Sequence, residues 1–259
     1  LQEMAAEKLR LGLTVLAVAW ATWCIAAMLA VGEGIRQGVL RTAQNGNGNL
    51  IYLTGGMASV DHGVFHQGKF LTLQKEDVDV VQTLPEVKTV APTARWNEYI
   101  TVGDRGTWLE PLAVTTEFAA MTKLAPLPGG RWLNPLDQKE MRKVVVLGYS
   151  LAADLFNPVD DFSWLATVTL QVDPVGEKIK IGNEEFTVVG VLAKNSAEIE
   201  QGDQINYSSF VPLATWQRFH TYGDIGGINV EPKDDANRER LAQTIRQVIA
   251  RRHGASVSD

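Results

Sequence analysis

Three short stretches carry residue types that could do chemistry, and each falls short of the pattern that its chemistry needs. Residues 63–70 read GVFHQGKF and match the G-x-x-x-x-G-K part of a phosphate-binding loop. Phe70 stands where a Ser or Thr must hold Mg²⁺, and the stretch follows polar residues rather than a strand. A surface loop is the simpler interpretation, so we expect no ATP hydrolysis by this chain itself.

The second stretch, GYSLA at 148–152, lies between an apolar run at 143–147 and a helical pattern. A hydrolase nucleophile elbow needs G-x-S-x-G, because its strained turn requires a small final residue, and Ala152 only approaches that requirement. A triad also needs a histidine on a loop after a strand, which neither His220 nor His253 offers. A role for Ser150 as a helix N-cap explains it more simply, so we predict no catalytic residue.

The third candidate combines Asp61, His62 and His66, residue types that bind metals. Gly63 breaks any helix that would place both histidines on one face, and no further ligand cluster is near in the sequence. A polar loop accounts for these side chains. The sequence therefore predicts no metal site and no cofactor.

The bulk composition describes a folded and mildly acidic chain. It has 259 residues, 45% of them apolar and 21% charged, with a net charge of −6. A basic face is usual in proteins that bind nucleic acid, so the charge argues against such a partner. The chain begins with Leu1 rather than Met, and we expect it to be part of a longer one.

Residues 11–31 read LGLTVLAVAWATWCIAAMLAV, with no charge between Arg10 and Glu33. About 20 apolar residues are the length that a helix needs to cross a bilayer. A signal peptide would have a shorter apolar run, and a buried core helix is the other alternative. We predict a transmembrane helix at 11–31, after an amphipathic cytoplasmic segment at 1–10. Equal numbers of basic residues flank the two ends of this helix, so the charges do not indicate its orientation in the membrane.

After residue 31 the helical pattern continues as a stalk at 32–44, until the turn-forming stretch NGNGN at 45–49 cuts it. The remainder predicts an α+β domain with many strands and few helices. Three strands are expected within 167–192, including a hairpin of 178–181 and 186–191. Further strands are expected at 50–54, 87–91, 98–102, 112–114, 143–147, 209–213 and 227–230, and helices at 74–84, 150–156, 215–219 and 235–253.

The order of several motifs resembles the MacB/FtsX-type permeases of ABC transporters, namely their first membrane span and periplasmic core domain. The similarity covers almost the whole chain, although 157–171 is longer and 45–49 richer in glycine than is usual. The motifs are KLRLGLTVL, MLAVGEGIRQGV, LPEVKTVAPTARW, GRWLN, KVVVLG, LAADLF, DPVGEKIKI, FTVVGVL and FVPLATWQRF.

The resemblance implies an α/β porter-like lobe at 45–104 and 208–259, with a mostly β lobe inserted at 105–207. It implies a bacterial inner-membrane permease with this domain in the periplasm, four spans per subunit, and ATP hydrolysis in a separate or fused ATPase. Such a subunit would pass ATPase-driven motion to its periplasmic domain to export or extract an envelope substrate. The implied partners are the cytoplasmic ATPase, a second or sister permease and a periplasmic adaptor.

In this interpretation the coupling residues lie on the stalk and on the final helix, which returns to the membrane. They are Gly32, Gly34, Ile35, Val39, Leu241, Ile245 and Val248. The alternative is a single-span anchored module, in which the soluble domain senses a ligand and the helix reports it. The two hypotheses differ in the number of spans that follow residue 259.

Overall fold

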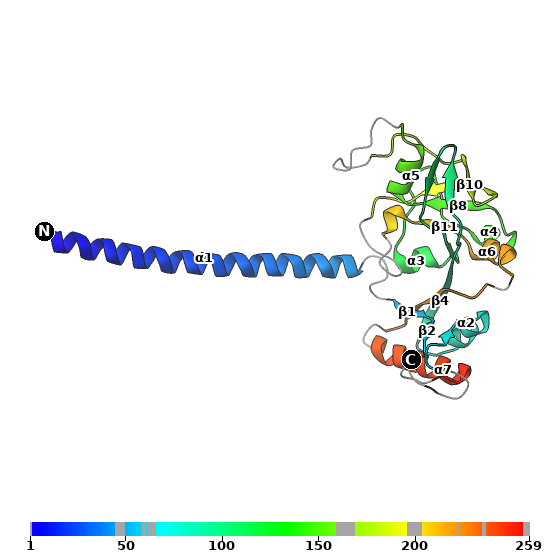
Figure 1. The fold of residues 1–259 in the computed structure, drawn as a ribbon, viewed down its shortest axis with the longest axis horizontal. Helices are drawn as coiled ribbons and strands as arrows, with labels where there is room; N and C mark the ends of the chain where they lie inside the picture. Colours follow the sequence, from blue (N-terminus) through cyan, green and yellow to red (C-terminus); the bar gives the residue numbers. More distant parts are fainter. Residues whose placement is uncertain are drawn as a thin grey trace. The chain divides into compact units, whose positions relative to one another are not determined.

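The computed structural model describes residues 2–44, 50–58, 61, 66–158, 169–195, 204–221, 223–234 and 237–255. The chain divides into two compact units, Leu1–Ala43 and Gln44–Asp259. The first unit is almost entirely the long helix α1 (Gln2–Gln44), and the second is a sheet-rich domain (Figure 1). Each unit is described by itself below.

Helix α1 contains a segment, Arg10–Arg36, that is long and apolar enough to cross a membrane. None of this segment is buried within the protein, and the predicted span at 11–31 lies inside it. The hydroxyls of Thr14 and Thr22 donate to carbonyl oxygens one turn earlier, at 2.6 and 2.8 Å, which satisfies them without water. The helix ends at Gln44, and the predicted turn at 45–49 lies outside the described residues.

In the described part of the second unit, ten strands form one mixed sheet in the order β1-β12-β4-β7-β11-β8-β10-β9-β5-β6. A separate antiparallel pair joins β2 (Gly56–Met57) to β3 (Phe70–Leu71). The bounds of the sheet strands are β1 Ile51–Thr54, β4 Val87–Arg95, β5 Ile100–Val102, β6 Arg105–Thr107, β7 Leu112–Val114, β8 Val144–Leu147, β9 Lys178–Ile181, β10 Glu184–Val191, β11 Ser209–Pro212 and β12 Gly227–Pro232.

The middle of the sheet is buried on both faces. Alternate residues of β8 enter different hydrophobic clusters: Val145 and Leu147 pack with one, Val144 and Val146 with the other. Side chains alternate across a strand, so the two clusters lie on opposite faces of the sheet. This explains why the sequence of β8 is an unbroken apolar run. The helices that cover this part are α3 (Phe118–Thr122), α4 (Pro135–Lys139), α5 (Tyr149–Phe156) and α6 (Leu213–Phe219).

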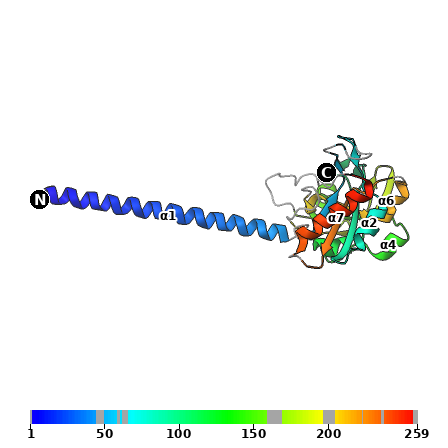
Figure 2. The same cartoon turned by 90° about the horizontal axis from the view of Figure 1, so that it is seen from below.

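At the β1–β12–β4 end of the sheet, a further cluster forms between the sheet and two helices. Helices α2 (Lys75–Gln82) and α7 (Arg238–His253) supply its helical side, and they lie side by side in Figures 1 and 2. All of these clusters are made by residues of the second unit. The domain therefore has a complete core without α1.

Most predicted elements are present, with shifted ends. The predicted strand 87–91 runs on to Arg95 as β4, through Pro92. Thr93 O accepts from Gly226 on the β12 side, so the nitrogen of Pro92 points the other way, and pairing with β7 begins only at Thr93. Pro92 therefore removes no interstrand hydrogen bond from β4. The predicted strand at 98–102 is shorter and starts at Ile100.

Two local predictions are wrong in detail. Gly148, not Ser150, is the N-cap residue of α5, and Ser150 lies buried inside the helix. The hairpin of β9 and β10 closes through Gly182 and Asn183 alone, because Glu184 already pairs with Ile181. Gly182 has a φ of +58°, a conformation that suits glycine in so tight a turn. Of the three strands expected within 167–192, the described residues 169–192 form two, β9 and β10.

Strand β11 follows the predicted lobe boundary at 207/208, and it pairs with β7 and β8, which precede that boundary in the chain. The hydrogen bonds of the sheet therefore join the two predicted lobes. The predicted lobe boundaries at 104/105 and 207/208 stay predictions.

Candidate coupling site

The predicted stalk residues lie within α1. Gly32, Gly34 and Ile35 fall in its described portion, where the Ile35 side chain is 63% exposed, and Val39 lies further along the same helix. Arg36 forms a bidentate ion pair with Glu33, with both contacts at 2.7 Å. The pair spans one turn, and α1 is uninterrupted from the apolar segment to Gln44. The backbone can therefore carry a displacement along this length.

The return helix α7 buries one face against the sheet. Leu241 and Ile245 are fully buried in the cluster with β1, β4 and β12, and Ile249 extends that face by one turn. Val248 is only half-buried and lies at the margin. Of the three residues predicted on this helix to take part in coupling, Leu241 and Ile245 are in the core and Val248 is at its margin, and their role in coupling stays a prediction.

The end of α7 is fastened to α2 by a buried carboxylate that the sequence did not point to. Asp77 is fully buried, and Arg252 donates through Nε to its Oδ1 at 2.9 Å. Nε2 of His253 lies 3.0 Å from Oδ1 and 2.9 Å from Oδ2. The backbone N–H of Gln74 donates to Oδ2 at 2.7 Å, at the start of α2. We call Asp77, Arg252 and His253 the Asp77 clamp.

The position of the Asp77 clamp matters because of what it joins. Arg252 and His253 are in the last turn of α7, just before Gly254 ends the helix with a φ of +70°. Asp77 contacts both basic side chains at the helix C-terminus, where the positive charge of Arg252 is also favoured by the helix dipole. The clamp therefore holds the last turn of α7 to α2 and the sheet.

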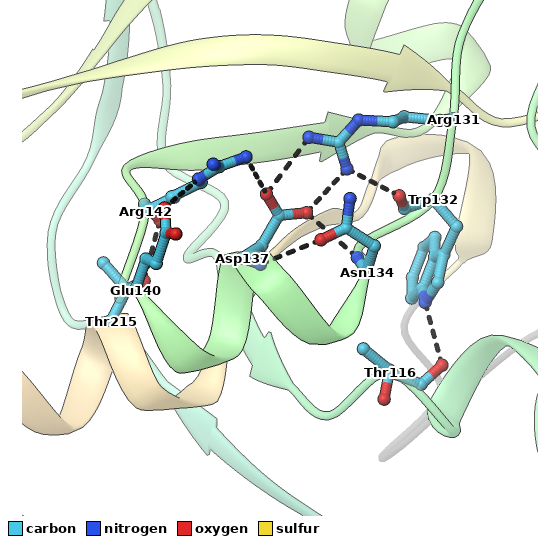
Figure 3. A network of polar contacts seen from close by, with 8 residues as sticks. All are labelled: Thr116, Arg131, Trp132, Asn134, Asp137, Glu140, Arg142 and Thr215. Carbon is cyan, nitrogen blue, oxygen red and sulfur yellow. Dashed lines mark hydrogen bonds and ion pairs between the residues drawn. The ribbon is translucent and has the colours of Figure 1, made fainter.

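A second buried carboxylate, Asp137, organises the middle of the domain (Figure 3). Arg131 donates to it twice, with Nη1 2.6 Å from Oδ2 and Nη2 3.1 Å from Oδ1. Arg142 approaches Oδ1 at 3.8 Å, and the backbone of Asn134 donates to Oδ2 at 2.9 Å. Asn134 in turn caps α4 by accepting from the Asp137 N–H. We call these four residues the Asp137 network.

The Asp137 network reaches two neighbouring segments. The hydroxyl of Thr215 in α6 donates to the Arg142 carbonyl at 2.8 Å, and the indole of Trp132 donates to Thr116 O at 3.1 Å (Figure 3). Every polar atom of the carboxylate has a partner, as a buried charge requires. The network thus joins α4, α6 and the chain before α3 into one rigid piece.

The motifs that could do chemistry lie in settings typical of structural roles. Residues 63–65 of the phosphate-loop match lie outside the described residues, and Phe70 begins the short strand β3 rather than a helix. His220 stacks on Trp216, with ring centroids 4.8 Å apart, and His253 is held by Asp77. The Asp61 and His66 side chains are mostly exposed, and His62 is outside the described part. Within the described residues, no group of three or more His, Cys, Asp or Glu could hold a metal ion.

A helix able to cross a membrane, joined to an α+β domain, defines a membrane-anchored domain. The chain belongs to the family of MacB-like periplasmic core domains, which matches residues 11–248. It contains the MacB-like periplasmic domain of an ABC transporter permease of the MacB/FtsX type, preceded by a helix long and apolar enough to cross a membrane.

Two curated relatives cover nearly all of this chain. It is 25% identical to "Macrolide export ATP-binding/permease protein MacB" of Bdellovibrio bacteriovorus, over 99% of this chain and 37% of the relative. It is 27% identical to "Pyoverdine export ATP-binding/permease protein PvdT" of Pseudomonas syringae pv. syringae, over 95% of this chain and 35% of the relative. The chain thus spans little more than a third of the length of these proteins.

Two solved structures share the fold. The periplasmic region of MacB from Actinobacillus actinomycetemcomitans superposes with a TM-score of 0.61 at 19% identity, covering 84% of this chain and 90% of that one. The extracellular domain of the ABC-type transporter YknZ from Gram-positive bacteria gives 0.59 at 14% identity, covering 80% and 94%. The mixed α+β fold expected from the sequence is confirmed.

Proposed function

We propose that this chain is the force-transmitting part of a permease subunit. A cytoplasmic ABC ATPase, separate or fused, moves α1 and the span that follows α7, and the periplasmic domain opens or closes in response. The subunit works as a dimer, with a second copy or a sister permease, in the bacterial inner membrane. The outcome is export or extraction of an envelope substrate, with help from a periplasmic adaptor.

The observation that carries this proposal is the fastening of the return helix at its end. Leu241, Ile245 and Ile249 bury one face of α7, and the Asp77 clamp holds its last turn. A helix attached only by its middle would fray when its end is pulled, because terminal turns open at little cost. The contacts of Arg252 and His253 with the buried Asp77 carboxylate make the last turn harder to open. The uninterrupted helix α1 offers the same stiffness on the entering side.

The two relatives are named for different exported compounds, a macrolide in one and pyoverdine in the other. Their shared part is the ATP-binding/permease architecture. We therefore propose the transmission role for this chain without choosing a substrate class.

The test is a proline in the stalk of the complete transporter that contains this chain. Ile35→Pro removes a helical hydrogen bond and kinks α1 at a cost of about 3 kcal/mol or more. We expect it to abolish transport while the periplasmic domain keeps its thermal unfolding profile and ATP hydrolysis continues. Ile35→Ala, which keeps the helix, is the matched control and should transport normally.

Normal transport by the Ile35→Pro protein would contradict the proposal. A gene that stops shortly after residue 259 would also contradict it and favour the single-span sensor, whereas three further apolar spans would support the permease.

A further inference from the structure

A small cavity of about 190 Å³ lies against the C-terminal half of α7, beside β1 and the short strand β3. It is distinct from the Asp77 clamp, and no contact described so far uses it. Its walls are mostly apolar, and the apolar residues that line it include Leu53, Leu71, Leu73, Ile249 and Ala250.

One charged residue lines the cavity within the described part of the chain. Arg246 lies on α7, one turn before Ala250, and its side chain is exposed. Among the described residues no carboxylate forms an ion pair with it, in contrast to Arg252 further along the same helix. An apolar hollow beside an unpaired guanidinium is complementary to a ligand with a short apolar tail and an anionic head.

The wall opposite α7 is held in place by a close approach of side chain to backbone. The Tyr52 ring lies over Gly227 so tightly that a Cβ at Gly227 would come within 2.4 Å of it. Tyr52 also lines the cavity. The Tyr52 ring is thus packed directly on the backbone of Gly227 in β12, and we expect this wall to keep its position when the cavity is empty.

We propose that this cavity binds a free medium-chain carboxylate, with the carboxylate on the Arg246 guanidinium and the tail against Ile249 and Ala250. Its size sets the tail length. An apolar cavity of about 150 Å³ accepts benzene, so this one holds roughly seven or eight non-hydrogen atoms. It is smaller than the roughly 300–1,000 Å³ of pockets that enclose drug-sized ligands, which excludes a whole bulky molecule.

The site would let a small ligand act on the return helix. A molecule seated against Ile249 and Ala250 contacts the last two turns of α7, between its buried face and the Asp77 clamp. Binding would stiffen this end of the helix, because the ligand fills the space into which these turns could relax. The proposal concerns binding by the domain and does not depend on transport.

The experiment is a titration of the isolated domain, residues 44–259, with octanoate, followed by amide NMR shifts of α7. We expect saturable shifts centred on Ile249 and Ala250. Octylamine, which reverses the head charge, and acetate, which lacks the tail, should give no saturable shifts. Arg246→Gln should weaken octanoate binding by about tenfold or more, since a charge-assisted contact is lost. Arg240→Gln, an exposed change on the same helix outside the cavity, should leave it unchanged.

Ala250→Leu provides a second test by filling the cavity, and we expect it to abolish binding in a domain whose spectrum remains folded. The proposal is overturned if octanoate gives no saturable shifts on α7. Equal octanoate affinity in the Arg246→Gln and wild-type domains also overturns it. Binding only to anionic vesicles, with none to free octanoate, would assign the site to a membrane surface and equally overturn the small-molecule proposal.

Discussion

The two buried aspartates solve the same problem in different parts of the domain. Asp77 and Asp137 are both fully buried, both lie in the first turn of a helix, and each lies beside two basic side chains. Asp137 finds its cations within a few residues, at Arg131 and Arg142. Asp77 is separated by 176 positions from His253. One carboxylate stabilises a local turn, and the other ties the end of the domain to its beginning.

The two sites join different parts of the domain. The Asp137 network joins α4, α6 and the chain before α3, whereas the Asp77 clamp joins α2 to the last turn of α7. Our proposed function gives transmission to the Asp77 clamp alone. The partners of Asp77 are also accessible, since the side chains of Arg252 and His253 are 35% and 13% exposed. Substitutions at the two sites should therefore differ in which part of the domain they loosen, as well as in the free energy of unfolding that they remove.

The largest effect is expected for Asp137→Ala. It removes the bidentate contact with Arg131 and leaves the Asn134 N–H without its acceptor in the middle of the domain, where no helix end can fray to relieve the loss, at a cost of about 3 kcal/mol in the free energy of unfolding. Urea unfolding of the domain measures this. Glu140→Gln is the control, because its ion pair with Arg142 is exposed and worth no more than about 1 kcal/mol. A loss below about 1 kcal/mol in Asp137→Ala would show that the network is not structural.

Asp77→Ala should cost less, about 2 kcal/mol, because fraying of the last turn of α7 lets Arg252 and His253 regain water. We expect hydrogen exchange to accelerate in that turn and to stay slow in the rest of the domain. Exchange that rises evenly over the whole sheet, as expected for Asp137→Ala, would remove the distinction between the two sites.

His253→Ala removes one side chain of the Asp77 clamp. It should lower the free energy of unfolding by about 1 kcal/mol, the value of one hydrogen bond, because Arg252 still donates to Asp77. Thermal unfolding and exchange of the last α7 turn are the measurements. Arg251→Gln, an exposed change in the same turn, is the matched control. If His253→Ala destabilises as much as Asp77→Ala, Arg252 contributes nothing.

The smallest effect concerns Glu117, which lines a cleft between α2 and α4, the helices that carry the two aspartates. Partial burial raises its pKa, but its own backbone N–H and the hydroxyls of Thr116 and Thr115 lower the pKa by more. The folded pKa is thus below the usual 4.5, so ionised Glu117 stabilises the fold above that pH and the benefit is lost as the pH falls through the folded pKa.

Glu117→Gln should therefore remove a few tenths of a kcal/mol at neutral pH and flatten the stability profile below pH about 4.5. Thr116→Val, which deletes the hydroxyl 2.8 Å from the carboxylate, should give part of the same change. An identical acid profile for the wild type and Glu117→Gln would contradict this assignment.

The sequence predicted those parts of the fold that depend on local pattern. Runs and periods of apolar residues predicted the transmembrane segment, strands β7, β8 and β12, and the amphipathic face of α7. Errors came where tertiary context decides. The strand β4 continues through Pro92 because of where its neighbours pair, and Gly148 takes the N-cap position that Ser150 seemed suited to fill.

The candidate site was predicted only in part. Leu241 and Ile245 could be found because burial on a helix repeats with its period, but Asp77 carries no such signal. A polar residue one turn into a helix resembles any other N-terminal acid, and its partners lie at the far end of the chain. By contrast, Arg131, Asn134 and Asp137 are close enough in sequence that the capping pattern before α4 could have revealed them.

The most direct test of the account is Asp77→Asn in the complete transporter, with ATP hydrolysis and transport measured in the same preparation. Asp79→Asn, an exposed change on the same helix α2, is the control. The account predicts that Asp77→Asn keeps hydrolysing ATP while the transport per ATP falls several-fold, and that the control remains coupled. Unchanged transport per ATP in a protein whose last α7 turn exchanges freely would contradict it.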